Sequence, residues 1–284
     1  MSLLRVEDTH FPKNSYFKIG EQLLDLKQPK IMGILNVSAD SFYAPSRKLE
    51  HTQILETAEK MIREGADILD IGGYSTRPGA VHVDTEIELE RVKHAISIIR
   101  KRFPDVILSV DTFRGSVAEA AIEYGANMIN DISGLRFDPT LKSVVAHYRV
   151  PYILMHSRGS VDCMHDVYVY DHIVRDVIST LATSIQELRD LGVHDIMIDP
   201  GFGFSKTVDQ NYELLKGLAD LHLLECPILV GFSRKSMIWK KLGITSEEAL
   251  NGTSVLNTYA LMNRCSIFRV HDVKEMKEIV QLLG

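Results

Sequence analysis

The chain has 284 residues, of which 32 are lysine or arginine and 38 are aspartate or glutamate, and its net charge is −6. This balance excludes a strongly basic nucleic-acid-binding surface, so we expect no nucleic-acid partner. Hydrophobic residues make up 45% of the chain and charged residues 25%, and 18 glycines and 9 prolines are too few for a disordered or fibrous protein. The composition indicates a globular protein with a sizeable core, built as one large domain or two medium ones.

No apolar run approaches the roughly 18 to 20 residues that a membrane span requires, so we expect no membrane partner. Residues 1–17 contain acidic side chains where a secretory signal would need an apolar stretch. The cysteines, Cys163, Cys226 and Cys265, are odd in number and form no CxxC or Cys/His cluster, which favours reduced thiols over disulfides or zinc ligands. These features predict a cytoplasmic protein.

Eight short, mostly apolar runs are typical of parallel strands buried on both faces. They cover 31–36, 67–73, 106–111, 127–132, 151–156, 195–200, 227–233 and 266–272. Segments with helical spacing of apolar residues separate them, as at Ile173, Val177, Leu181 and Leu188. This alternation, without any linker, predicts an α/β fold of the closed (β/α)8 TIM barrel type, because a doubly wound open sheet needs fewer strands.

Residues 1–30 precede the first of these strands. They include a candidate β-hairpin between Phe17 and Leu26, which would cover the closed bottom of the barrel. No internal repeat or low-complexity segment interrupts the rest of the sequence. We therefore expect a single domain over 1–284, with 1–30 as an N-terminal extension or hairpin and 31–284 as the barrel.

Polar residues gather where the expected strands end, and in a barrel these ends meet at the rim that carries the active site. Asp111 and Asp199 end two of the runs, although a single polar residue after a strand is often a helix N-cap or a turn former. With the amide of Asn130 and the amine of Lys235 they can bind the edge of a flat heterocycle rich in N–H groups. Such groups are costly to bury unless a ligand satisfies them.

A second group at the rim is cationic. It consists of Arg77, Arg234, Lys235, Arg269 and His271, next to Asn36. Arginine forks match phosphate oxygens, and the loops after the last barrel strands commonly bind phosphate, although a lone arginine here is as readily a surface ion pair. Arg269 and His271 alternate on one strand and therefore share its inward face. The helix expected after Ser233 would add its N-terminal amides, so an anion site is predicted here.

Glycines stand where a ligand would approach the backbone, at Gly72, Gly73, Gly201, Gly203 and Gly231. Phe204, between a glycine and Ser-Lys, is expected to be an aromatic wall rather than a core residue. The sequence has no Ser/His/Asp triad signature, no HExxH and no metal-ligand spacing.

The ordered motifs GILNVSADSF, DIGGYSTRPGA, SVDT, NDISG, LMH, DPGFGFSK, GFSRKSM and RVHDV run through about residues 31 to 280. In order and spacing they resemble the motifs of the dihydropteroate synthase family of folate biosynthesis. The resemblance implies a pterin-binding transferase that joins 6-hydroxymethyl-7,8-dihydropterin diphosphate to p-aminobenzoate, releasing diphosphate and forming 7,8-dihydropteroate, with Mg2+ as cofactor. It also implies a homodimer and a sulfonamide target.

The resemblance gives each matching residue a role. The pterin ring would contact Asp111, Asn130, Ile132, Met155, Asp199, Phe204, Gly231 and Lys235. The diphosphate would contact Asn36, Arg77, Arg269 and His271, and Asn36 would also touch Mg2+. The p-aminobenzoate pocket would use Phe42, Thr76, Pro78, Phe204, Lys235 and Ser236. The residues implied to act in catalysis are Asp111, Asp199, Lys235, Arg269 and His271.

The implied chemistry suits this set of residues. Diphosphate leaves readily once cations neutralise its charge, and an electron-rich pterin can stabilise the carbocation left on its exocyclic methylene. We therefore expect a dissociative, SN1-like substitution in which Asp111 stabilises the developing positive charge. The aniline nitrogen attacks without a base because its pKa is low, so no general base is expected near Thr76.

The first loop departs from the family's usual NVTPDSFSDGG. Ala39 replaces a proline, Ala44 replaces the second aspartate, and Pro45-Ser46 replace two glycines. Tyr74 stands where glutamate is common, and Phe232 stands where threonine, methionine or valine is common. A stiffer first loop without that carboxylate would close differently, so its effect on activity and on sulfonamide sensitivity stays open.

Two alternatives also stay open. The first is the barrel of a methyltetrahydrofolate:corrinoid methyltransferase, which would need neither the Ser-Arg-Lys anion site nor the RVHDV motif. The second is a pterin-binding homologue without turnover, which a steady-state assay of diphosphate release would identify.

Overall fold

The computed structural model describes residues 16–20, 22–37, 44–74, 83–163 and 166–284. Within these ranges eight strands form one parallel sheet in which neighbours in sequence are neighbours in space. They are β3 (Lys30–Asn36), β4 (Ile68–Gly72), β5 (Ile107–Asp111), β6 (Met128–Asp131), β7 (Tyr152–Met155), β8 (Ile196–Asp199), β9 (Leu229–Val230) and β10 (Ile267–Val270). Each lies within or close to one of the eight apolar runs.

The sheet closes on itself. Strand β10 pairs with β9 on one side and with β3 on the other, so the last strand of the chain lies beside the first. Between β8 and β9 a parallel bridge joins Ile198 to Ile228, and the Ile198 N–H donates to the Pro227 carbonyl over 3.0 Å. The prediction of a closed (β/α)8 barrel is confirmed.

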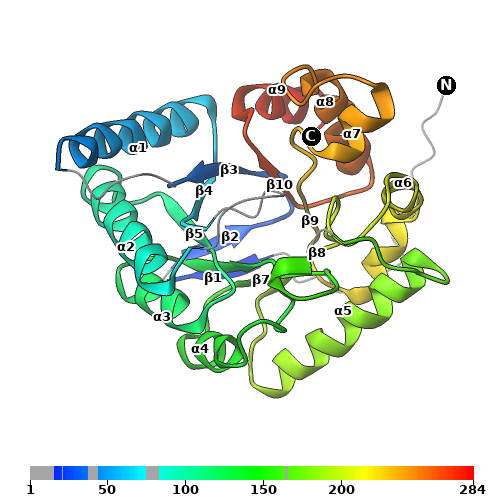
Figure 1. The fold of residues 1–284 in the computed structure, drawn as a ribbon, viewed down its shortest axis with the longest axis horizontal. Helices are drawn as coiled ribbons and strands as arrows, with labels where there is room; N and C mark the ends of the chain where they lie inside the picture. The colour runs from blue at the N-terminus through cyan, green and yellow to red at the C-terminus, as the bar shows by residue number, and fades with distance from the viewer. Residues whose placement is uncertain (1–15, 21, 38–43, 75–82, 164–165) are drawn as a thin grey trace.

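Helices lie around the outside of the strands (Figure 1). They are α1 (Ala44–Glu64), α2 (Thr85–Arg102), α3 (Gly115–Glu123), α4 (Thr140–Tyr148), α5 (Ile173–Asp190), α6 (Val208–Lys216), α7 (Ser236–Leu242), α8 (Leu250–Met262) and α9 (Val273–Leu283), with 3-10 turns η1 (Val161–Cys163) and η2 (Leu218–Leu224). Alternate strand residues such as Leu69, Ile71, Leu108 and Val110 are buried in the core that these helices share. The other strand residues therefore face the barrel interior.

The lower interior is apolar and is covered by a hairpin. Strands β1 (Tyr16–Ile19) and β2 (Gln22–Asp25) pair antiparallel. Their apolar side chains share one buried cluster with the first inward residues of the barrel strands, namely Met32, Ile68, Met128, Ile153, Met197, Leu229 and Ile267. The Lys18 N–H donates to Asp195 Oδ2 over 3.1 Å and holds the hairpin against the start of β8. The expected N-terminal hairpin is confirmed, whereas the single-domain boundary at residue 1 stays a prediction because 1–15 lie outside the described residues.

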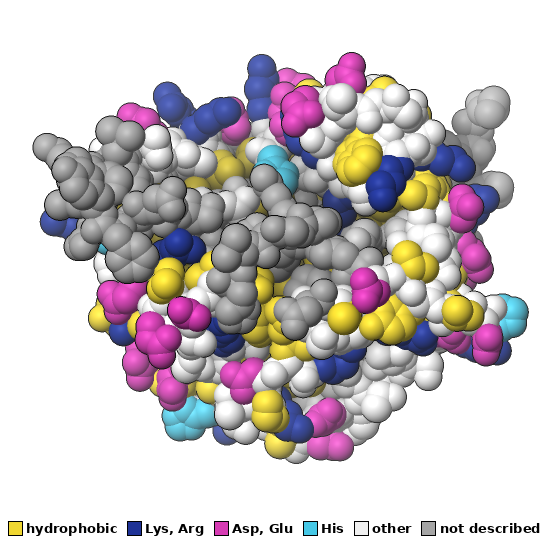
Figure 2. Space-filling model, viewed as in Figure 1, with side chains coloured by type: hydrophobic (Ala, Val, Ile, Leu, Met, Phe, Trp, Pro, Cys, Tyr) yellow, Lys and Arg dark blue, Asp and Glu magenta, His cyan; other side chains and the backbone are white. Residues whose placement is uncertain are grey.

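On the face of the molecule that Figure 2 shows, charged side chains of both signs are interspersed among the described residues, with apolar side chains between them. Among the described residues, no helix combines the length and the apolar character needed to cross a membrane. None of the three cysteines forms a disulfide.

Candidate active site

The upper interior of the barrel is polar, in contrast to its floor. Strands β4, β5, β6, β8 and β10 each turn one ionic or amide side chain inward. These side chains are Asp70, Asp111, Asn130, Asp199 and Arg269. Register brings them together, because Gly72 of β4 pairs with Asp111 and Asp111 pairs with Asn130. All the residues of this inner set except Arg269, which is half-buried, are buried.

Arg269 links two carboxylates of the inner set. Its Nε donates to Asp70 Oδ2 over 2.7 Å, and its Nη2 donates to Asp111 Oδ2 over 2.7 Å. Asn130 Nδ2 donates to the same Asp70 oxygen over 3.0 Å. Burial would lower the pKa of Arg269, but Asp70 and Asp111 together raise it above its usual range. Burial raises the pKa of Asp111 to about 7 against the opposing effect of Arg269.

Asp70 was not among the residues expected at the site. The expected carboxylates end their apolar runs, whereas Asp70 lies inside the run at 67–73. The sequence nevertheless indicated that Asp70 has a partner, because a carboxylate in the middle of an apolar strand is costly to bury unless it is paired. Its cationic partner lies on β10, 199 residues further along the chain, and only the closed barrel brings the two together.

Asp199 and Lys235 are a second pair of oppositely charged groups that interact electrostatically in the upper barrel interior. Burial raises the pKa of Asp199, with Lys235 opposing the shift, and burial lowers the pKa of Lys235 to about 8, with Asp199 opposing it. The Lys235 ammonium donates to the Phe202 carbonyl and lies 4.8 Å from the centre of the Phe204 ring. The Gly201 N–H donates to Asp199 Oδ1 over 2.7 Å. The β8 loop therefore holds both charged groups in place.

A second lysine fixes the same loop. The Lys206 ammonium is buried and donates to the carbonyls of Gly201 and Phe204 over 2.9 and 3.1 Å, and it lies 3.1 Å from His156 Nδ1. Burial lowers the pKa of Lys206 to about 7, with Asp199 opposing the shift. No role was expected for this lysine from the sequence, and its two carbonyl contacts join the two ends of the segment 201–204.

An apolar cluster, called the apolar wall below, lies beside the inner set, since its Met155 pairs with Asp199. It consists of Phe113, Ile132, Met155 and Phe204, with Tyr74, Phe137 and Val161 packed against it. Phe204 is buried in this cluster beside Ile132 and Met155, so its expected role as an aromatic wall for a ligand stays a prediction. Phe113 was not expected here. The Tyr74 ring meets Phe113 edge-on at 5.3 Å, so this unusual residue extends the wall.

Gly203 is needed for the position of Lys235. Its φ is +83°, and a Cβ there would lie 3.0 Å from Lys235 Cδ. We expect Gly203→Ala to lower the free energy of unfolding by about 1–2 kcal/mol, the cost of a left-handed residue with a side chain, and also to weaken ligand binding by displacing Lys235. Gly192→Ala is the matched control, because Gly192 has φ +81° and no atom within 4 Å of the added carbon.

Thermal unfolding and ligand titration of both variants check this prediction. Both should lose stability, and only Gly203→Ala should lose affinity. Equal affinity in the two variants would show that Gly203 serves the backbone alone.

His271 and Asn36 lie at the rim above the inner set, and both are exposed. His271 follows β10, and its Nδ1 lies 2.9 Å from Ser233 Oγ, which also accepts the His271 N–H over 3.2 Å. Asn36 ends β3 next to Gly72, where a Cβ would come within 3.3 Å of its Oδ1. The serine orients the imidazole, and the bare glycine backbone leaves room for the amide.

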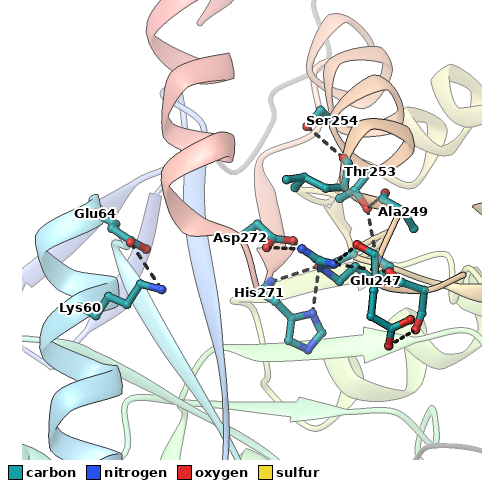
Figure 3. Close-up of polar contacts among 12 residues, drawn as sticks. Lys60, Glu64, Glu247, Ala249, Thr253, Ser254, His271 and Asp272 are labelled. Carbon is teal, nitrogen blue, oxygen red and sulfur yellow. Dashed lines mark hydrogen bonds and ion pairs between the residues drawn. The ribbon is translucent and has the colours of Figure 1, made fainter.

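Arg234 does not take the place expected for it in the cationic group. Its backbone has a φ of +54°. Its Nε and Nη2 donate to the two carboxylate oxygens of Asp272 over 3.0 and 2.9 Å, so its guanidinium is bound away from the inner set. Its Nη1 donates to the Glu247 carbonyl over 2.7 Å, and its N–H donates to Thr253 Oγ1. Figure 3 shows His271 and Asp272 side by side, with Glu247 and Thr253 opposite them. The Arg234 fork therefore ties the loops together.

A buried network supports the segment after β5. Glu88 of α2 is fully buried, accepts from Thr112 Oγ1 over 2.6 Å and pairs with Arg114 over 2.6 Å. Gly115, the first residue of α3, donates its N–H to Asp138 Oδ2. The residue that caps α3 is Arg114 and not Asp111, and the Thr112 hydroxyl donates to Glu88.

Several expected site residues lie outside the described residues. They are Phe42, Thr76, Arg77 and Pro78, and of the altered first loop also Ala39. Ala44 and Pro45 are the first two residues of α1, where a proline is tolerated because first-turn N–H groups have no helical partner. Ser236 begins α7 directly after Lys235. Phe232 is fully buried against the Phe202 ring, so it is a packing residue.

Comparison with known proteins defines the class. The family of pterin binding enzymes matches residues 32–271, which contain the whole inner set and His271. The closed barrel and its polar mouth belong to this class. Dihydropteroate synthase of Streptococcus pyogenes serotype M6 is 40% identical over 271 residues, covering 94% of this chain and 98% of the relative.

Two solved structures agree with this relative. Dihydropteroate synthase of Yersinia pestis in a sulfonamide drug complex superposes with a TM-score of 0.87 at 37% identity, covering 94% of this chain and 98% of the other. The Xanthomonas albilineans enzyme with 4-aminobenzoic acid gives 0.86 at 36% identity, covering 94% and 96%. The chain belongs to the dihydropteroate synthase family. The transferase function implied by the motifs is confirmed at this level, and the corrinoid methyltransferase alternative is not supported.

Proposed function

We propose that the protein condenses 6-hydroxymethyl-7,8-dihydropterin diphosphate with p-aminobenzoate to give 7,8-dihydropteroate and diphosphate. The observation that carries the proposal is the inner set with Lys235, in which carboxylates, an amide and cations converge in the upper barrel interior beside the apolar wall. Relatives crystallised with 4-aminobenzoic acid or with a sulfonamide support p-aminobenzoate as the second substrate and sulfonamides as inhibitors.

The pterin ring is assigned to the inner set. Its ring and exocyclic N–H groups would donate to Asp111 and Asp199, and Asn130 offers both a donor and an acceptor. Lys235 would donate to a ring acceptor while remaining close to Asp199. The face of the ring would rest on Met155 and Phe204. Gly231 presents bare backbone beside Lys235 and Arg269, where a side chain would narrow the cavity.

The diphosphate is assigned to the rim, where Asn36, Arg77, Arg269 and His271 would bind it. Mg2+ prefers oxygen ligands and usually keeps waters while it binds substrate phosphates. The Asn36 amide oxygen, exposed at the end of β3 beside the bare backbone of Gly72, fits such an ion. When bound, Mg2+ would neutralise charge on the leaving diphosphate.

The reaction then follows from charge placement. The bond between the exocyclic methylene and the diphosphate oxygen breaks with its electron pair on the diphosphate, which Arg269 and His271 stabilise. The cation left on the pterin is stabilised by the ring electrons and by the Asp111 carboxylate. The aniline nitrogen then forms the new C–N bond and releases its proton to water. The aromatic acid would lie between Phe204, Lys235 and Ser236 on the described side, with Phe42, Thr76 and Pro78 completing its pocket.

The deciding experiment measures diphosphate release by the full chain with Mg2+ and each substrate alone or both together. We expect continuous release only with both, matched by an equal amount of 7,8-dihydropteroate. Pterin binding without turnover would identify the non-catalytic homologue and would overturn the proposal.

The titrating groups predict a bell-shaped pH profile for kcat/KM with the pterin substrate, which reports pKa values of the free enzyme. Asp111, with its pKa at about 7, accepts ring N–H groups as a carboxylate and loses that charge as the pH falls below this value. Lys235, with its pKa at about 8, loses its charge as the pH rises above that value. The charged groups that influence the pKa of Asp111 are Arg269, which lowers it, and Asp70, Glu88 and Asp131, which raise it, and Asp111 in turn raises the pKa of Lys235.

We expect kcat/KM to be greatest between pH 7 and 8 and to fall on both sides, roughly tenfold per pH unit once each group has titrated. In Lys235→Arg the alkaline limb should move to higher pH, because guanidinium keeps its charge. A profile that stays flat from pH 6 to 9.5 would contradict the assignment of both groups.

We also propose a cytoplasmic homodimer, as the family resemblance implies. The lack of disulfides among the three cysteines supports a reducing compartment. One face of α8 exposes Val255, Tyr259 and Met262, which are spaced to lie along one side of the helix and suit contact with a second copy. Sedimentation equilibrium of the full chain tests the dimer, and a monomer at micromolar concentration would exclude it.

A further inference from the structure

Asp70 is the most deeply buried charged group of the inner set. It lies on β4 two residues before Gly72, the residue that pairs with Asp111, so it sits one layer deeper in the barrel than Asp111. Its side chain is 0% exposed, compared with 10% for Asp111 and 20% for Arg269. A substrate lying at the level of Asp111 would leave Asp70 beneath it.

The hydrogen bonds of Asp70 are all on one oxygen. Oδ2 accepts from Arg269 Nε and from Asn130 Nδ2, over 2.7 and 3.0 Å. Oδ1 is buried and has no hydrogen-bond partner in the described part of the chain. The same holds for Ser109 Oγ of β5, the residue that pairs with Asp70 in the sheet. Arg269 is the cation that Asp70 bonds, so loss of this pair would leave a buried carboxylate with one amide donor.

The hydrogen bonds of Arg269 to Asp70 and to Asp111 differ in whether a bound ligand can replace them. An unpaired buried charge costs several kcal/mol, so the Asp70 pair cannot open without a large penalty. The Arg269–Asp111 pair is more exposed, and there the N–H groups of a bound ring can replace Arg269 Nη2 as donors to the Asp111 carboxylate. Ring binding should therefore release Nη2 from Asp111 and leave Nε on Asp70.

We propose that Asp70 is a positioning residue that anchors Arg269 by its Nε while the pterin ring replaces Nη2 on Asp111. The anchored guanidinium then donates from Nη2 to the substrate and no longer donates to Asp111. This inference rests on the proposed function, because it takes the pterin as the group that binds Asp111. Without the charge of Asp70, Arg269 would pair with Asp111 alone and compete with the incoming ring.

A double-mutant cycle on the full chain tests this role, with calorimetric affinity for 6-hydroxymethyl-7,8-dihydropterin diphosphate as the readout. We expect Asp70→Asn to weaken binding at least tenfold in the parent protein, and less than threefold in the Arg269→Ala background, where the competitor is gone. Ser109→Ala is the control, because it removes a neighbouring buried polar atom that bonds nothing in the described chain, and it should stay within twofold. The KM for p-aminobenzoate of Asp70→Asn should also stay within twofold.

An equal loss in both backgrounds would show that Asp70 only supports the fold, and no loss in either would show that it positions nothing; either result overturns the inference. Arg269→Lys keeps the proposal testable if Asp70→Asn does not fold, since one ammonium cannot span both carboxylates as the guanidinium does. It should also lose at least tenfold in affinity, and affinity within threefold of the parent would contradict the anchor. If the parent protein does not bind this compound at all, the proposed function fails instead.

Discussion

Lys235→Ala is expected to abolish measurable formation of 7,8-dihydropteroate while the protein stays folded. The ammonium is held between the β8 loop and the cavity, where it lies close to Asp199 and to the Phe204 ring. Removing it deletes a charged hydrogen bond to the substrate and leaves Asp199 without the cation that most strongly opposes the rise in its pKa. Loss of such a bond costs about 1.5–3 kcal/mol, or one to two decades in binding. Calorimetry with the pterin substrate and a product assay measure the two effects.

Two further variants sharpen this test. Asp199→Asn removes the other member of the pair and should have an effect of similar size. Lys240→Ala removes an exposed lysine five residues further along the chain, which stacks on Trp239, and should change neither binding nor turnover. If Lys235→Ala binds the pterin substrate as well as Lys240→Ala does, Lys235 lies outside the site.

The architecture was predictable because its determinants are local. Parallel strands buried on both faces appear as short apolar runs, and all eight runs became strands of the barrel. The extent of each strand was less predictable. The run at 227–233 forms only the two-residue strand β9, because Ile228 bridges to β8 while Gly231 and the residues after it turn into the rim.

The site was predictable mainly where its residues lie near the carboxyl ends of strands or in the loops that follow them. Asp111, Asn130, Asp199 and Lys235 converge as expected, because parallel strands finish at one rim. Asp70 and Glu88 were missed, since the arginines that compensate their burial are far away in sequence. A positive φ at Arg234 decides where its side chain goes, and no residue type in the motif reveals that angle.

Arg269→Ala should remove most of the thermal stabilisation that diphosphate with Mg2+ gives the protein. A ligand at a hundred times its Kd stabilises a folded protein by about 2.7 kcal/mol, which is several degrees in Tm. Arg269 is the arginine of the inner set that is assigned to the diphosphate, so its loss should leave only a small shift from the remaining rim residues. Because Asp70 then lacks its cation, the variant should also unfold about 3–5 kcal/mol more easily, and each shift is measured from the variant's own baseline.

Arg234→Ala is the matched control for this experiment. Arg234 lies beside His271 in the loop network, but its fork is bound to Asp272 and the Glu247 carbonyl. Its removal should lower stability by loosening the loops after β9 and β10 while keeping most of the diphosphate shift. If Arg234→Ala loses the shift and Arg269→Ala retains it, the anion lies against the loop network instead of above the inner set, and the assignment of the rim residues is wrong.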